Sequence, residues 1–170
     1  MSSKSQDEKC FLNMAGEFLV AGELNRRHIL CAVTYGTAKS ADVWAFDSCS
    51  SRAARVEVKT TGPDSKKVVI GEKPLKSEAS PDVFYVLVQL PEPLPPETTE
   101  DAERGQHAPR FFVFRSEEMK ALLGDADTKY RATHRNWRGR GVPQMELDRV
   151  REFENRWDKI EERVKSTDLR

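Results

Sequence analysis

The sequence predicts one α/β domain in which helices flank a mixed β-sheet. Three observations lead to this prediction: an amphipathic helical repeat near the start, several short apolar runs rich in β-branched residues, and a length of 170 residues. A chain of this size buries roughly 70% of the surface that its unfolded form exposes. We therefore expect residues 1–170 to form a single domain around one core, without help from disulfides or a structural metal.

Composition limits the partners and the cellular compartment that we expect for this protein. Lys plus Arg and Asp plus Glu are equal at 28 each, so a polyanionic partner needs a local basic patch. Cys10, Cys31 and Cys49 are odd in number and lack C-x-x-C spacing, which indicates free thiols in a reducing compartment. The polar opening and the short apolar runs predict no membrane span. A cytoplasmic protein is expected.

The first third of the chain is expected to fold as a helix, a strand and a hairpin. Apolar residues recur every three or four positions over about 7–27, which is the stripe of an amphipathic helix. Residues 28–35 are apolar and end at Gly36, so they predict a buried strand. Residues 41–47 and 54–61 are two further strands, and the short polar loop between them favours an antiparallel hairpin.

The middle of the chain predicts one strong strand between two irregular segments. Residues 62–81 contain prolines and lysines without a clear helical period, although 67–70 can form a short strand. Residues 82–90 are almost continuously apolar, as in a central strand covered on both faces. Residues 91–109 mix five prolines with polar residues and are expected to form an exposed, flexible loop.

The last third predicts a strand and two helices. Residues 110–114 form the strand, and Ser116 caps a helix that is expected to stop at about residue 123, before Gly124. Residues 128–141 are expected to be a basic loop. Apolar residues at helical spacing over 145–164 predict a C-terminal amphipathic helix that packs on the sheet.

The candidate chemistry lies on the predicted hairpin. Side chains alternate along a strand, so Glu57 and Lys59 project to one face while Val56 and Val58 project to the other. Asp42 opens the neighbouring strand, and the hairpin returns Glu57 close to it. Two such carboxylates repel each other unless a cation lies between them, and Mg²⁺ or Mn²⁺ suits oxygen ligands. The alternative is a solvated polar face with a carboxylate and an ammonium in loose contact.

The pattern of Asp42 followed by Glu57-Val58-Lys59 resembles the PD-(D/E)XK nuclease superfamily. The helix from Gly16 to Arg27 is similar to the Gly-Glu-x-x-x-Ala-x-x-Leu segment of small resolvase-like members. The strings from Tyr35 to Asp42 and from Val56 to Thr61 resemble short, mostly uncharacterised prokaryotic members.

This resemblance implies a restriction-endonuclease-like core in the order α-β-β-β-(α)-β. It implies that Asp42, Glu57 and Val58 hold the metal. Lys59 would then orient or help deprotonate an attacking water and stabilise charge on a phosphate. Glu17 takes the position of the helix carboxylate, although Glu23 is close by in the sequence.

Two departures from the family pattern affect these expectations. Ala41 replaces the proline before Asp42, which leaves the carboxylate in place. The segment after Gly62 shows neither a clear crossover helix nor the Gln-x-x-x-Tyr motif of the exonuclease-like branch. The sequence therefore favours neither exonuclease nor endonuclease action.

A basic loop over 128–141 is the predicted nucleic-acid patch. Its arginines can pair with phosphates, and Tyr130 or Trp137 can stack on bases. A solubilising loop is the alternative. The residues assigned to nucleic-acid binding are Lys39, Lys129, Arg131, Arg135, Arg138 and Arg140.

The leading hypothesis from the sequence is a Mg²⁺-dependent or Mn²⁺-dependent deoxyribonuclease that acts in repair, recombination or defence. The second hypothesis is a non-catalytic module that binds nucleic acid or protein through the same fold. The third is a nuclease subunit that needs a partner, and a homodimer is also left open. The carboxylate pair favours the enzyme, because a surface that only binds phosphates has no reason to keep repelling carboxylates.

Overall fold

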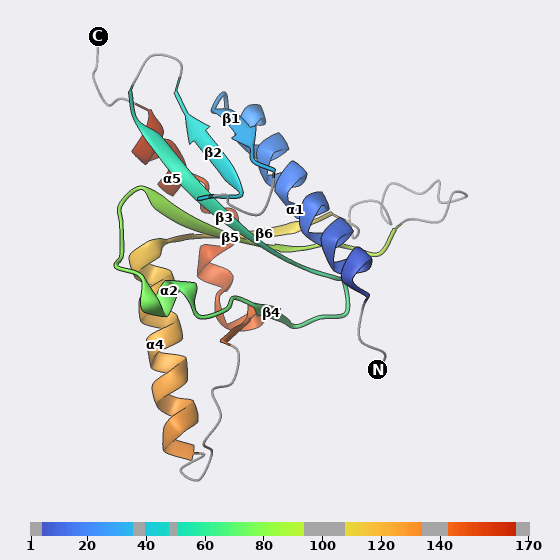
Figure 1. The fold of residues 1–170 in the computed structure, drawn as a ribbon, viewed down its shortest axis with the longest axis vertical. Helices are drawn as coiled ribbons and strands as arrows, with labels where there is room; N and C mark the ends of the chain where they lie inside the picture. Colours follow the sequence, from blue (N-terminus) through green and yellow to red (C-terminus); the bar gives the residue numbers. More distant parts are fainter. Residues whose placement is uncertain (1–4, 36–39, 48–50, 94–107, 134–142, 166–170) are drawn as a thin grey trace.

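The computed structural model describes residues 5–35, 40–47, 51–93, 108–133 and 143–165. It contains a five-stranded mixed sheet with helices on both faces and a separate two-stranded sheet (Figure 1). The elements, in chain order, are α1 (Gln6–Arg26), β1 (Leu30–Val33), β2 (Val43–Phe46), β3 (Ala53–Thr61), β4 (Lys67–Val69), α2 (Lys73–Lys76), β5 (Val83–Gln89), β6 (Arg110–Arg115), α4 (Ser116–Thr133), β7 (Gln144–Glu146), the 3₁₀ turns η1 (Leu147–Arg149) and η2 (Arg151–Phe153), and α5 (Asp158–Val164).

The order of strands in the main sheet is β1-β2-β3-β5-β6. The first three strands are antiparallel neighbours, β3 and β5 are parallel, and β6 returns antiparallel to β5. A parallel pair needs a crossover connection. Here the crossover from β3 to β5 contains β4, which pairs with β7, and the short helix α2. The predicted mixed sheet and antiparallel hairpin are confirmed.

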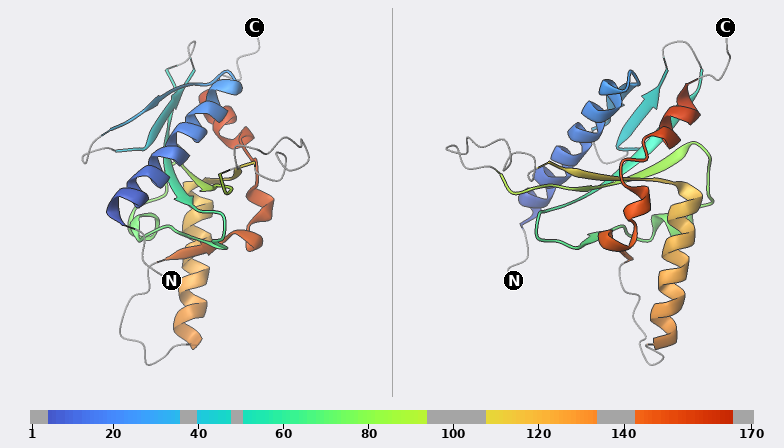
Figure 2. Two further views of the ribbon diagram at one scale, coloured as in Figure 1. Left: turned by 90° about the vertical axis from the view of Figure 1, so that its right-hand side faces the viewer. Right: turned by 180° about the vertical axis from the view of Figure 1, so that it is seen from behind.

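Each face of the main sheet has its own hydrophobic core. On one face, α1 and α5 cover a cluster that includes Val20, Leu24, Val56 and Ile160. On the other face, α4 and the segments around β4 and β7 cover a cluster that includes Phe114. Figure 2 shows α1 and α5 on one side of the sheet and α4 on the other. The sheet is therefore the central layer of three.

Helix α1 begins with a capping box that its sequence specifies. The Ser5 side chain accepts a hydrogen bond from the Glu8 N–H, and the Glu8 carboxylate accepts one from the Ser5 N–H. Farther along the helix, Gly16 lies against β3. A Cβ built on Gly16 would lie 2.0 Å from the Thr60 Oγ1, so only glycine allows this approach.

The predicted strands are present, with one error in burial. β5 lies between β3 and β6 and is buried along most of its length, as the apolar run predicted. β1 was predicted to be buried, but it is an edge strand, and Leu30 is 48% exposed. Alternate residues of β1 pack on the core, and the rest face outward because no helix covers that side of the edge strand.

The helix after Ser116 was predicted to stop before Gly124, but α4 continues to Thr133. Nothing lies within 4 Å of a Cβ built on Gly124, and one glycine inside a helix costs only about 1 kcal/mol. No proline follows to end the helix. Residues 128–133, predicted as the start of a basic loop, are therefore helical.

The single helix predicted over 145–164 is also wrong. The segment instead forms β7, two 3₁₀ turns and the short helix α5. Asn155 has a φ of 56°, a left-handed conformation that interrupts a right-handed helix. Its N–H donates a hydrogen bond to the Phe111 carbonyl at 2.8 Å. The apolar stripe still marks the core, because Leu147, Val150 and Trp157 are buried.

Most of the proline-rich loop predicted over 91–109 lies outside the described residues. Among the helices that the structure describes, none is long and apolar enough to cross a membrane.

Candidate active site

Asp42 lies directly before β2, at the point where the β2–β3 ladder ends with the pair Val43 and Val56. Its N–H donates to the Val56 carbonyl at 3.0 Å, and its carboxylate accepts a hydrogen bond from the Val58 N–H at 2.7 Å. At this position β2 provides no backbone carbonyl for the Val58 N–H, so the Asp42 carboxylate accepts that hydrogen bond instead. This bond holds Asp42 beside the Glu57-Val58-Lys59 segment of β3.

Glu57 is 7% exposed and projects from β3 on the face opposite to α1. Its carboxylate accepts a hydrogen bond from the Lys73 ammonium of α2 at 2.5 Å. The Lys73 side chain is 57% exposed, whereas the Glu57 side chain is 9% exposed. The buried carboxylate is therefore balanced by a lysine whose chain runs out into solvent.

Lys59 follows Glu57 by two residues, so it lies on the same face of β3, as predicted. Its register partner on β5 is Leu87, and the partner of Glu57 is Tyr85. The Lys59 ammonium makes no hydrogen bond or ion pair with another residue in the described ranges. It is a partly exposed cation two residues from Glu57 on the same face of β3.

Glu17 lies on α1 next to Gly16, on the stripe of the helix that contacts β3, and it is 7% exposed. Glu23 lies near the end of the helix and forms ion pairs with Arg26 and Arg27. Of the two glutamates, Glu17 therefore has the buried position beside the sheet. That its carboxylate faces Asp42 and Glu57 stays a prediction.

The burial of these carboxylates is unusual, because an ionised group is costly to bury unless it is paired. Two other buried polar residues in the described part of the chain have structural roles. Ser116 exchanges hydrogen bonds with the backbone of Ser80, and Lys159 donates to Glu118 and to the Val113 carbonyl. The remaining buried polar residues of the described ranges are Glu17, Asp42 and Glu57.

Tyr85 reports on the electrostatics of the Glu57 site. Burial, together with the nearby charge of Glu57, raises the pKa of Tyr85 to about 12, although Arg55 opposes this change. Both causes disfavour the phenolate. The raised pKa of Tyr85 thus indicates that Glu57 and Tyr85 are electrostatically coupled.

A cavity of about 120 Å³ opens beside Glu57. Its walls include Lys73 from α2, Tyr85 from β5, Ser116 from the start of α4, and Arg55. The crossover between β3 and β5 thus forms a wall of the site. The carboxylate of Glu57 can be reached from this cavity.

The predicted nucleic-acid patch is only partly described. Lys129 and Arg131 belong to the last turns of α4. Lys39, Arg135, Arg138 and Arg140 lie outside the described residues. The patch as a whole therefore stays a prediction.

Metal ligation by Asp42, Glu57 and Val58 also stays a prediction. Within the described ranges, no group of three or more His, Cys, Asp and Glu side chains is arranged to hold a metal ion. The proposed ligand set contains only two carboxylate side chains, Asp42 and Glu57, and its third ligand is the backbone carbonyl of Val58. The Val58 carbonyl lies past the last β2–β3 pair, so β2 provides no ladder partner for it.

Sequence reasoning missed three residues of this region: Lys73, Arg55 and Trp44. Lys73 lies in the segment without a helical period, so its position depends on the crossover. Arg55 shares the strand face of Glu57, and Trp44 is its register partner on β2. Strand alternation alone could have placed both on the site face.

Comparisons of the chain with family models, with curated proteins and with solved structures give no match.

Proposed function

We propose that this protein is a metal-dependent nuclease that hydrolyses phosphodiester bonds in DNA. The observation that carries the proposal is the hydrogen bond from the Val58 N–H to the Asp42 carboxylate. It holds one buried carboxylate beside the strand that presents Glu57 and Lys59. The sheet order and the parallel crossover from β3 to β5 support a restriction-endonuclease-like core.

The donor set fits a hard divalent cation. Mg²⁺ takes oxygen ligands and commonly uses one or two carboxylates, with water and substrate phosphate completing its shell. Asp42, Glu57 and the Val58 carbonyl would hold Mg²⁺ or Mn²⁺. When bound, the ion supplies Lewis-acid polarisation of a phosphate oxygen.

The protein's own groups have separate roles in this proposal. Lys59 orients the attacking water and stabilises negative charge that grows on the phosphate. Glu17, on α1 beside β3, adds a further carboxylate. Lys73 pairs with the Glu57 carboxylate until its exposed side chain moves away.

One observation favours the second function, a non-catalytic binding module. The ion pair with Lys73 already satisfies the charge of Glu57, so a metal is not required to explain the buried carboxylate. In that case the site is a structural ion pair on a surface that binds nucleic acid or protein. A cleavage assay with charge-neutral variants separates the two functions.

The assay uses linear, circular, single-stranded and branched DNA with Mg²⁺, Mn²⁺ or a chelator. Asp42→Asn keeps an oxygen that accepts from the Val58 N–H but loses the charge, so cleavage should fall to the chelator level while the fold is kept. Glu57→Gln should behave in the same way. Lys59→Ala should lose about 100-fold to 1000-fold in rate while metal binding survives.

Variants of the basic segment provide the contrast. Neutralising Arg135, Arg138 and Arg140 together should weaken binding to all sequences and flatten its salt dependence. The Asp42 and Glu57 variants could instead keep wild-type activity while the arginine variant loses function. In that case the binding-module function would replace the nuclease function as the proposal.

A further inference from the structure

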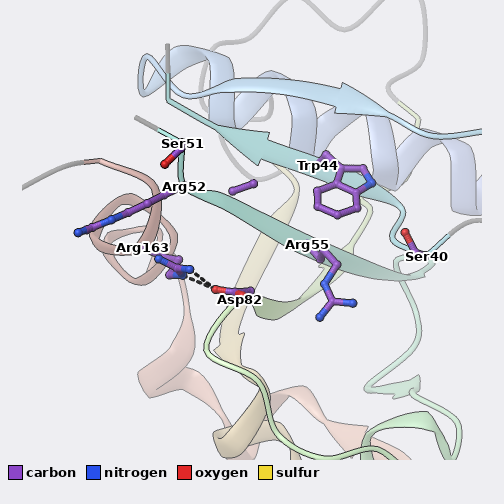
Figure 3. Close-up of a pocket in the computed structure, with 8 residues that line it drawn as sticks. Ser40, Trp44, Ser51, Arg52, Arg55, Asp82 and Arg163 are labelled. Atoms are coloured by element: carbon purple, nitrogen blue, oxygen red, sulfur yellow. Dashed lines mark hydrogen bonds and ion pairs between the residues drawn. The ribbon is translucent and has the colours of Figure 1, made fainter. Parts of the chain in front are cut away.

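A groove of about 620 Å³ lies on the same sheet face as Glu57, at the outer part of β2 and β3 (Figure 3). Trp44 and Arg55 line it from the two strands, and Arg163 of α5 lines it from the opposite side. Ser40 and Arg55 belong both to this groove and to the cavity beside Glu57. The two hollows therefore adjoin each other.

The groove is positively charged. Its ionisable groups are three arginines and one aspartate, and Arg163 pairs with that aspartate, Asp82. The Arg55 guanidinium makes no hydrogen bond or ion pair with another residue in the described ranges. Figure 3 shows its side chain extending away from the sheet. A free guanidinium of this kind is a good donor to a phosphate.

Trp44 supplies an aromatic surface next to this charge. It is paired in register with Arg55, so the two side chains project from neighbouring positions on one face of the hairpin. The Trp44 ring is half-buried and borders the groove. An aromatic ring beside a cation is the combination that binds single-stranded nucleic acid, because the ring stacks on a base and the cation pairs with the backbone.

We propose that this groove binds an unpaired segment of DNA and leads it to Glu57. Trp44 stacks on a base, and Arg55 pairs with the adjacent phosphate. Arg55 and Glu57 are two residues apart on one strand, which is about 7 Å, so the bound phosphate and the phosphate to be cut are near neighbours. The inference rests on the proposed nuclease function and specifies its substrate as DNA with single-stranded character, since bases inside a duplex are not free to stack on Trp44.

The test measures binding in chelator, so that its result does not depend on cleavage. A fluorescently labelled oligothymidylate and a duplex of the same length are titrated with wild-type protein. The wild type should bind the single strand more tightly than the duplex. Trp44→Ala should weaken single-strand binding about ten-fold, which is the loss of one stacked base. Arg55→Gln should weaken it and reduce the salt slope by about 0.7, which is one phosphate contact.

Matched controls separate the groove from general charge and from unfolding. Arg149→Gln removes an exposed arginine that pairs with Glu146 outside the groove, and it should leave binding unchanged. Trp44→Phe keeps a ring in the strand. Quenching of tryptophan fluorescence by the oligonucleotide should be smaller in Trp44→Phe than in the wild type, and this readout does not require Trp44→Ala to fold.

Three results would overturn the proposal: equal binding by wild type and by a folded Trp44→Ala, quenching in Trp44→Phe that is as large as in the wild type, or a preference for duplex that depends on neither Trp44 nor Arg55. If the groove variants lose binding while even the wild type shows no cleavage, the proposed DNA-binding groove is supported and the proposed nuclease function is rejected. If Asp42→Asn and Glu57→Gln lose cleavage but the groove variants bind DNA normally, the nuclease function is supported and the proposed DNA-binding role of the groove is rejected.

Discussion

At the scale of single residues, Asp42 joins the end of a strand to the proposed site. Its carboxylate accepts the Val58 N–H at 2.7 Å, and its own N–H reaches the Val56 carbonyl. Charge-assisted bonds of this kind are shorter and stronger than neutral ones. The same side chain that ends the β2–β3 ladder therefore fixes the distance between Asp42 and the Glu57-Val58-Lys59 segment.

Tyr85 provides a way to observe the charge at this site. The pKa of Tyr85 is raised to about 12 by burial and by the Glu57 carboxylate. Glu57→Gln removes the second cause and should lower this pKa, while burial keeps it above the ordinary value of 10.0. NMR titration of the tyrosine ring carbons measures it, with Tyr85→Phe to identify the signal. An unchanged pKa in Glu57→Gln would mean that the two side chains are not electrostatically coupled.

The candidate carboxylates were predictable because the alternation of side chains along a strand and the antiparallel pairing of a hairpin both depend on local sequence. Glu57 and Lys59 share a face for that reason, and Asp42 precedes the paired strand. Lys73 was not predictable in the same way. Its contact with Glu57 depends on a crossover whose prolines and lysines carry no periodic signal.

At the scale of elements, α2 supplies the ammonium that pairs with Glu57. It is a single helical turn in the crossover, and it places Lys73 on the buried carboxylate (Figure 1). A divalent cation that binds Glu57 has to compete with this ammonium. The short helix is therefore a determinant of metal affinity in the proposed function.

Removing the ammonium should strengthen metal binding. Lys73→Gln should bind Mg²⁺ or Mn²⁺ a few-fold more tightly, the range expected for a partly exposed ion pair. Isothermal titration calorimetry measures the affinity. Lys76→Gln is the matched control, because Lys76 lies in the same turn and pairs with Glu72 instead. Weaker metal binding in Lys73→Gln than in Lys76→Gln would show that Lys73 supports the site and does not compete for it.

Helix α1 depends on Gly16 for its distance from β3. Gly16→Ala should lower the free energy of unfolding by about 1–3 kcal/mol, because the new Cβ meets the Thr60 Oγ1 and the core is overpacked. Gly22→Ala, in the same helix, meets nothing within 4 Å and should raise stability by about 0.5–1 kcal/mol. Chemical denaturation compares the two. A stabilising Gly16→Ala would contradict the close approach.

The error over 145–164 has a clear physical origin. Apolar residues at helical spacing over 145–164 mark buried positions, and a strand followed by two 3₁₀ turns buries them equally well. Asn155 then takes a left-handed conformation and bonds to Phe111 on β6. That contact is tertiary, so no local pattern could predict it. The strands of the main sheet were predicted because their apolar runs are short and bounded by turn residues.

At the scale of the whole molecule, an ion pair joins the main sheet to the C-terminal segment. The Arg110 guanidinium of β6 donates twice to Glu154, at 2.8 and 3.0 Å. The hydrogen bond from Arg110 lowers the pKa of Glu154 below its usual 4.5, against the opposing effect of burial. The pair fixes the turn that carries α5 onto the sheet.

The pKa of Glu154 sets the pH dependence of this contribution. Because the folded pKa is lower than the unfolded one, the pair stabilises the protein above about pH 4.5 and loses its effect as the pH falls through the folded pKa. Glu154→Gln should lower the free energy of unfolding by about 1 kcal/mol at neutral pH, a value kept small because both side chains are about one third exposed. The difference from wild type should shrink in acid.

Urea denaturation at neutral and at acidic pH checks this expectation. Asp148→Asn serves as the control, because its pair with Arg151 lies on the surface and should matter little. A deficit of Glu154→Gln that stays constant as the pH falls would contradict an effect through the carboxylate charge.

The sheet topology also implies an order in which the site assembles during folding. The β2–β3 hairpin joins residues close in sequence, whereas the parallel β3–β5 pair must first close a loop of more than twenty residues. Local pairings form faster than distant ones. Asp42 and Glu57 are therefore expected to meet on the hairpin before the crossover brings the Lys73 ammonium to the Glu57 carboxylate. The Glu57–Lys73 ion pair is thus expected to form late in folding, together with the parallel pairing of β3 and β5.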